Sequence, residues 1–154
     1  LAQFFTSSGT FTIPAGVTAI KATVIGGGGG GGNSNSGSYI GGNGGNSTVA
    51  SGTQTISTIT GGGGLGGYNS GATGVGSGGT INFTGNQYNG SGYGANGTGA
   101  NNGAPGGQAI KYLTGLTPGN TLAVTIGSGG SGGAAHNCCP TSTAGQSGMV
   151  LIEW

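Results

Sequence analysis

The chain has 154 residues, which is enough for one small hydrophobic core but not for two independent ones. Glycine supplies 44 of these residues, and two basic residues and one acidic residue give a net charge of +1. This composition excludes a basic patch that neutralises phosphates, so we expect no binding to nucleic acid. No apolar run approaches the length of about eighteen residues that a membrane-spanning helix needs, so we expect no membrane insertion.

A glycine-rich sequence of this kind is often a disordered linker, because glycine loses more backbone entropy on folding than any other residue. The apolar residues argue against that alternative, since they are gathered into a few runs with the alternation of β-strands. We therefore expect a single folded, glycine-rich domain over residues 1–154.

Three predicted β segments occupy the first part of the chain. Residues 4–13 have the pattern of a hairpin-like stretch, with the Ser-Ser-Gly tripeptide at 7–9 as turn material. Residues 17–25 form the best predicted strand, because apolar side chains alternate along it and give it one apolar face. This strand runs directly into a tract of glycine, and a further β-rich run follows at residues 47–60.

Three more predicted strands lie near the end of the chain, at residues 108–113, 121–126 and 149–154. The first two are separated by Thr-Pro-Gly-Asn at 117–120, which suits a type I or type II turn with proline at its second position. The last strand is apolar and alternating, so we expect it to pair with another strand of a sheet.

The glycines between the predicted strands recur at every third position in several short lines. Gly26, Gly29 and Gly32 form one such line, and others begin at Gly61 and Gly127. Three residues per turn is the period of the polyproline II helix, which must pair its backbone groups with neighbouring chains. We therefore predict a mostly β fold with an irregular glycine-rich region: a small β-sheet or sandwich core joined to a bundle of short, left-handed polyglycine II helices, with essentially no α-helix.

A set of motifs stands at both ends of the chain and in its best strand. These motifs are SGTFTIPAGVT at 8–18, ATVI at 22–25 before a glycine tract, LTPGNTLAVTIG at 116–127 and GMVLIEW at 148–154. Together they resemble the glycine-rich domain found at the C-terminal ends of phage tail fibres. The resemblance implies a small sheet structure, glycine segments like the polyglycine II bundles of phage tail-tip adhesins, and receptor specificity carried by variable loops at the ends of the glycine rods.

Chemically reactive side chains are scarce. The only acidic side chain is that of Glu153 and the only imidazole that of His136, so no acid–base pair can be assembled and we expect no enzymatic activity. A Cys–His dyad or a soft-metal site built from His136 with Cys138 or Cys139 lacks an orienting carboxylate, a fourth ligand and the usual cysteine spacing. We therefore expect a small polar loop there, with no metal and no cofactor.

The aromatic residues outside the best strands are the candidate binding residues. Tyrosine among glycine, serine and asparagine is typical of an adaptable recognition surface. The alternative is that each ring caps a glycine rod or fills the seam between bundle and sheet. We expect exposed loops at residues 33–40, 68–93 and 135–143. The predicted receptor-binding residues are Tyr39, Tyr68, Phe83, Tyr88, Tyr93, His136 and Asn137.

Together these features predict a non-enzymatic receptor-binding tip at the distal end of a phage tail fibre. Its partner would be a bacterial outer-membrane protein or surface glycan, and other tail-fibre chains would join it in a homotrimer. We expect a location on the virion, extracellular when it acts, after assembly in the host cytoplasm. Two alternatives stay open: a purely structural fibre module, and an ice-binding polyproline II bundle, which requires a regular threonine ladder on one face.

Overall fold

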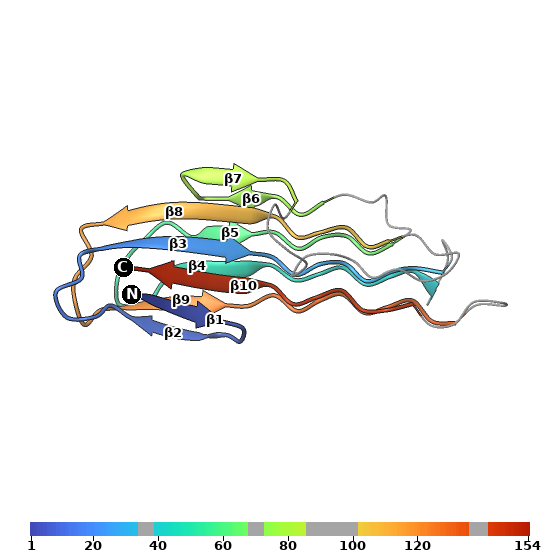
Figure 1. Cartoon of the computed structure of the whole chain (residues 1–154), viewed down its shortest axis with the longest axis horizontal. Helices are drawn as coiled ribbons and strands as arrows, with labels where there is room; N and C mark the ends of the chain where they lie inside the picture. Colours follow the sequence, from blue (N-terminus) through green and yellow to red (C-terminus); the bar gives the residue numbers. More distant parts are fainter. Residues whose placement is uncertain (34–38, 68–72, 86–101, 136–141) are drawn as a thin grey trace.

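The computed structural model describes residues 1–33, 39–67, 73–85, 102–135 and 142–154. Among these residues it has ten β-strands and no α-helix, which confirms the expected mostly β fold. The strands belong to two five-stranded antiparallel sheets on either side of one core (Figure 1). The strands are β1 (Ala2–Phe5), β2 (Gly9–Thr12), β3 (Ala19–Ile25), β4 (Ser47–Ser51), β5 (Ile59–Gly61), β6 (Gly76–Ser77), β7 (Ile81–Phe83), β8 (Gln108–Thr114), β9 (Thr121–Thr125) and β10 (Met149–Glu153).

Sheet A has the strand order β1-β10-β3-β8-β7, and sheet B has the order β2-β9-β4-β5-β6. Each expected strand range overlaps at least one of these strands, and residues 47–60 overlap two, β4 and β5, which pair with each other. Residues 68–93 were expected to form a loop, but β6 and β7 lie within them. An isolated bridge between Val75 and Thr84 joins the two sheets at this edge.

The expected hairpin at residues 4–13 is wrong, because β1 and β2 lie in different sheets. β1 pairs with β10 in sheet A, and β2 pairs with β9 in sheet B. The two strands bury Phe5 and Phe11 in one core from opposite sides. An isolated hairpin is at best marginally stable in water, and burying both rings in a sandwich is worth more than local pairing.

The core follows the period-two alternation of the strands. In β3 the side chains of Ile20, Ala22 and Val24 are buried, as the alternation predicts, while Lys21 and Thr23 lie on the outer face of sheet A. Sheet B contributes side chains of the same kind to the other side of the core. Its fully buried members are Phe11, Val49, Ile59 and Leu122.

Two turns of the sandwich depend on glycine with a positive φ angle. Gly119 has a φ of 87° at the third position of the turn at 117–120, in which the Asn120 N–H donates to the Thr117 carbonyl at 3.1 Å. A positive φ at this position selects the type II turn over type I. Gly16, with a φ of 77°, has the same place in the turn between Pro14 and Val17.

The outer face of sheet B carries small hydroxyl and methyl side chains. Thr125, Thr48, Thr60 and Ser77 are register partners across β9, β4, β5 and β6. Neighbouring strands lie about 4.8 Å apart, so these side chains form a regular row. This row lies on the sandwich and not on the glycine-rich segments, where the ice-binding alternative requires its ladder.

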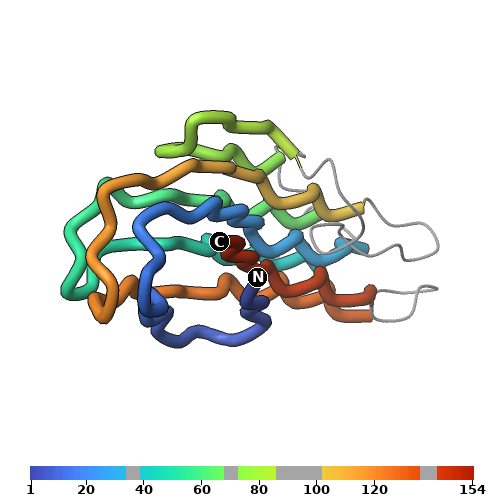
Figure 2. Tube along the Cα trace, turned by 60° about the vertical axis from the view of Figure 1, so that its left-hand side comes forward, coloured from blue at the N-terminus to red at the C-terminus, as the bar shows by residue number. Residues whose placement is uncertain are grey.

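The strands β3, β5 and β9 lead into glycine-rich segments, and β4, β8 and β10 follow directly from such segments. These segments extend side by side away from the sandwich, as both views show (Figures 1 and 2). They comprise residues 26–33, 39–46, 62–67, 102–107, 127–135 and 142–148.

Segment 26–33 lies at the centre of the others, because its backbone groups bond to all of them. The carbonyls of Gly27 and Gly30 accept from segment 62–67, and those of Gly28 and Gly31 accept from segment 127–135. Successive N–H groups of the central segment donate to three further segments in turn. These donations, of 2.9 to 3.1 Å, run from Gly26 to Gly107, Gly27 to Gly45, Gly28 to Gln146, Gly29 to Ala104, Gly30 to Gly42 and Gly31 to Thr143.

The glycine segments approach one another too closely for side chains. A Cβ atom at Gly30 would overlap the carbonyl group of Ser131, and one at Gly63 would overlap that of Gly44. Glycine at these positions is therefore a packing requirement, because it lets one backbone touch the next.

Candidate functional site

The glycine segments end together on the side of the molecule farthest from the chain termini (Figure 1). Leu1 and Trp154 are paired on the sandwich, where the N-terminal amine donates to the Trp154 carbonyl at 2.7 Å and the Trp154 N–H donates to the Leu1 carbonyl at 2.9 Å. The described residues that flank 34–38 and 136–141 lie at the opposite, glycine-rich end. The structure therefore brings together the bases of two of the three predicted recognition loops.

A buried asparagine joins these two loop bases. Asn33 Nδ2 donates to the Ala134 carbonyl at 2.8 Å, and Ser142 Oγ donates to Asn33 Oδ1 at 2.7 Å. The Asn33 N–H also donates to the Tyr39 carbonyl at 2.8 Å. We call these four residues the Asn33 clamp. Because Asn33 and Ser142 are only 8% and 5% exposed, losing a partner would leave a buried polar group unsatisfied.

The predicted binding residues within the described ranges lie in different places. Tyr39 is half-buried in the Asn33 clamp. Phe83 ends β7 opposite Gln108, at the junction of sheet A and the glycine segments, so it belongs to an edge strand and not to a loop. Pairing with β8 outweighs the glycine-rich surroundings that suggested a loop. The other predicted binding residues lie outside the described residues: Tyr68, Tyr88, Tyr93, His136 and Asn137.

Removing the Asn33 side chain is expected to loosen the glycine-rich end while the sandwich stays folded. In Asn33→Ala the Ser142 hydroxyl and the Ala134 carbonyl both lose a buried partner, which costs about 1–3 kcal/mol. The Ser142 N–H, which donates to Gly133, should then exchange its hydrogen faster, whereas the amides of β3 should not. Hydrogen exchange followed by mass spectrometry or NMR measures both.

Asn82→Ala is the matched control for this variant. The Asn82 side chain also makes two hydrogen bonds, both with Gly79, but they are exposed and lie on the sandwich. Its loss should leave exchange at the glycine-rich end unchanged. Unaltered protection of the Ser142 amide in Asn33→Ala would contradict the clamp.

The chemistry of the Asn33 clamp is that of neutral hydrogen-bonding groups: an amide, a hydroxyl and backbone carbonyls. Such groups hold a surface in place and bind by hydrogen bonding. Among the described residues, no group of three or more His, Cys, Asp or Glu side chains is placed to hold a metal ion. Within the same ranges, no helix has the length and apolar character to cross a membrane.

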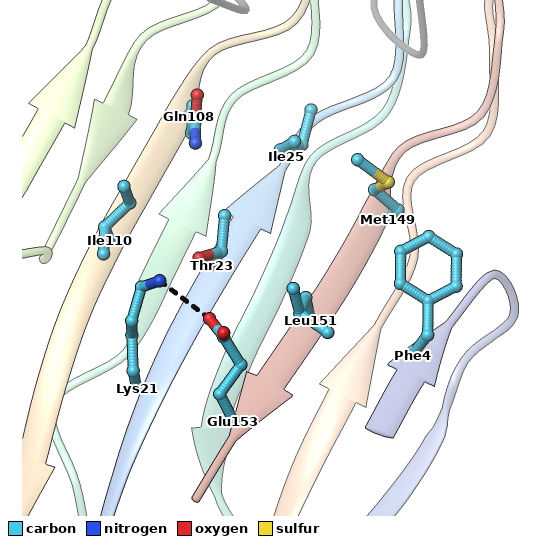
Figure 3. A pocket seen from close by; sticks show the side chains of 9 residues that line it. All are labelled: Phe4, Lys21, Thr23, Ile25, Gln108, Ile110, Met149, Leu151 and Glu153. Carbon is cyan, nitrogen blue, oxygen red and sulfur yellow. Dashed lines mark ion pairs between the residues drawn. The ribbon is translucent and has the colours of Figure 1, made fainter. Parts of the chain in front are cut away.

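A hollow of about 360 Å³ on the outer face of sheet A is a second feature, which the sequence predictions missed (Figure 3). Apolar side chains from β1, β3, β8 and β10 line it, and at one end Lys21 Nζ lies 2.7 Å from Glu153 Oε2. β10 contained the signal for this surface, since Met149 and Leu151 alternate with buried apolar residues of the same strand. A strand that is apolar on both faces is typical of one covered on both sides.

The arrangement that bears on function thus has two parts. The sandwich carries both termini and the hollow of sheet A, and the glycine-rich end carries the Asn33 clamp. Comparison of the chain with protein-family models, with curated proteins and with solved structures finds no match.

Proposed function

We propose that the glycine-rich segments form a bundle of polyglycine II helices that presents a receptor-binding tip. The period of the hydrogen bonds supports this helix type. In segment 26–33 the N–H groups of Gly27 and Gly30, three residues apart, donate to the same neighbour, and the residues between them donate to other segments. A helix with three residues per turn directs its donors in this way. The overlap that an added Cβ would produce at positions such as Gly30 and Gly63 is a second support.

The proposed activity is adhesion without chemistry: the domain is the tip of a phage tail fibre and recognises a bacterial outer-membrane protein or surface glycan through loops of the glycine bundle. The Asn33 clamp is the observation that carries this proposal. It holds together the bases of two segments of recognition-type composition, at the end opposite both termini. A fibre joined through either terminus would present this end to the cell surface.

Recognition by this tip would depend on hydrogen bonding and aromatic contact. The sequence has only three charged side chains, and two of them, Lys21 and Glu153, form an ion pair on the sandwich. Aromatic rings give contact area at low entropic cost, and small polar residues give adaptable hydrogen bonds. Adsorption should therefore change little with salt, because screening acts on charge.

Adsorption of the labelled domain to a panel of bacterial strains tests the proposal. We expect saturable, strain-restricted binding that falls more than about tenfold in Tyr88→Ala/Tyr93→Ala, because aromatic residues dominate most binding surfaces. These tyrosines belong to the predicted recognition loops. Cells stripped of surface glycan or of individual porins identify the receptor class.

The matched control is Thr55→Ala/Thr58→Ala. Both threonines are exposed in the connection between β4 and β5, at the end of the sandwich away from the glycine segments. This variant should adsorb like the wild type. Failure of the folded wild-type domain to adsorb to any strain, or full adsorption by the double tyrosine variant, would overturn the adhesin proposal.

A purely structural fibre module is the second candidate. The specific observation in its favour is segment 26–33, whose backbone bonds to neighbours on every side and so makes a stiff rod. A module of this kind would stiffen or end a fibre shaft without touching a receptor. Phage carrying shortened loops would then adsorb to the host as well as wild-type phage, whereas an adhesin would lose adsorption.

A further inference from the structure

The outer face of sheet A carries large apolar side chains across its whole width. One row of register partners crosses all five strands of the sheet, from β1 to β7. Thr23 at its centre is the single polar member, and Phe4 and Ile81 at its ends are 55% and 44% exposed. The row consists of Phe4, Leu151, Thr23, Ile110 and Ile81.

The rows on either side extend this surface. Met149 and the buried Ile25 are partners in one of them, toward the glycine segments, and the buried polar side chain of Gln108 follows in the same row. Tyr112, which is 59% exposed, lies opposite Lys21 in the other. The hollow shown in Figure 3 lies within these rows.

Sheet B, in the same sandwich, gives the appropriate comparison. Its outer face carries threonine, serine and alanine, such as Thr10 and Ala123, which are partners in β2 and β9. Both outer faces belong to five-stranded sheets, so the fold places the same requirement on the side chains of each face. The large apolar side chains of sheet A are therefore not required by the sandwich, and contiguous exposed apolar patches mark interaction surfaces.

The charged side chains on this face limit the kind of partner that could bind to it. Lys21 and Glu153 are half-exposed on it and pair at 2.7 Å, so the face carries both signs in balance (Figure 3). A partner must then be apolar and bring no unpaired charge, because an unpaired charge buried in an interface is costly. A second copy of this chain meets that condition, because its Lys21 and Glu153 pair with each other. Its remaining charged side chain, Lys111, lies opposite Ala22, which faces the core.

We propose that the outer face of sheet A is the surface through which copies of this chain associate. Five strands about 4.8 Å apart and about 17 Å long give a footprint of roughly 400 Å² on each copy. Protruding side chains such as those of Phe4 and Tyr112 increase the area removed from water. Two such footprints make about 800 Å², and with the protruding side chains the buried area approaches about 1,000 Å², the lower limit for a specific interface. Association should therefore depend on concentration and strengthen when a fibre holds the copies together.

Sedimentation equilibrium tests the proposal by measuring the mass of the purified domain at protein concentrations from about 1 μM to about 1 mM. An interface of this size dissociates within this range. The wild type should rise from monomer to one defined oligomer. Phe4→Lys/Ile81→Lys places two charges on exposed positions of the face and should weaken association at least about tenfold. Thr12→Lys/Thr125→Lys adds the same charge to exposed positions of sheet B and should associate like the wild type.

A monomeric wild type over the whole range would overturn the proposal, and so would wild-type association by Phe4→Lys/Ile81→Lys. Far-UV circular dichroism shows whether each variant is folded. If the lysine pair does not fold, Phe4→Ser/Ile81→Ser takes its place, with the same two outcomes. The inference does not depend on receptor binding, because a monomeric variant that still adsorbs to cells separates self-association from adhesion.

Discussion

Replacing Gly30 by alanine is expected to lower the free energy of unfolding by about 3 kcal/mol, the upper end of the usual cost of overpacking. Gly30 lies in the central segment, where an added Cβ would overlap the carbonyl group of Ser131. Backbone atoms cannot rotate away as a side chain does, so the segments must separate. Separation stretches the hydrogen bonds that the Gly130 and Gly133 N–H groups donate to the Gly28 and Gly31 carbonyls. Urea unfolding, followed by the fluorescence of Trp154, measures the loss.

Gly9→Ala is the matched control for this substitution. A Cβ at Gly9 would have the Phe5 ring as its nearest neighbour, at an ordinary contact distance of 3.7 Å. Alanine there should leave stability unchanged or raise it by up to about 1 kcal/mol, because it restricts the unfolded chain. Equal losses in the two variants would mean that the close approach of the segments is not the cause. Wild-type stability of Gly30→Ala would contradict the close packing itself.

The second large effect is expected for Phe11→Ala, which should lower the free energy of unfolding by about 3–5 kcal/mol. The Phe11 side chain is fully buried, and its ring lies 5.4 Å from that of Trp154, centroid to centroid, with the planes at 53°. The substitution leaves a cavity and removes this aromatic contact. Because Trp154 then loses its neighbour, its emission should also shift to longer wavelength in the folded state. Urea unfolding and fluorescence spectra check both results.

Thr10→Ala, one residue away in β2, is the control. Thr10 is exposed on the outer face of sheet B, so its loss should change stability by no more than about 0.5 kcal/mol. A similar, small effect of both substitutions would show that Phe11 does not lie in the core.

Period-two alternation was sufficient to locate the main strands, because one face of each strand packs on the core. The buried side chains of Ile20, Ala22 and Val24 are an example. The assignment of strands to sheets was not predictable in the same way. β1 pairs with β10 across nearly the whole length of the chain, and no local pattern specifies which side of a sandwich a strand joins. β6 and β7 were missed because they are short and lie among glycine and serine.

At the glycine-rich end the sequence indicated that segments contact one another, but not which segments are neighbours. Lines such as Gly26, Gly29 and Gly32 predict that backbones touch. All glycines present the same surface, however, so side-chain pattern cannot fix which segment lies beside which. Asn33 was missed as a buried residue because it resembles the other polar residues around it. Its burial depends on Ser142, which is 109 positions away in the sequence.

The central position of segment 26–33 also determines when the chain can fold. The ribosome makes this segment before its hydrogen-bonding neighbours, which come from five later segments, the last of them residues 142–148. β10, the last strand, must still insert between β1 and β3. Contacts between residues so distant in sequence require the closure of long loops, which lowers the entropy of the chain. Folding is therefore slow and takes place after these residues have been synthesised. A translation product that ends before residue 142 leaves sheet A incomplete and segment 26–33 partly unpaired, so the described fold can be completed only once residues 142–154 have been made.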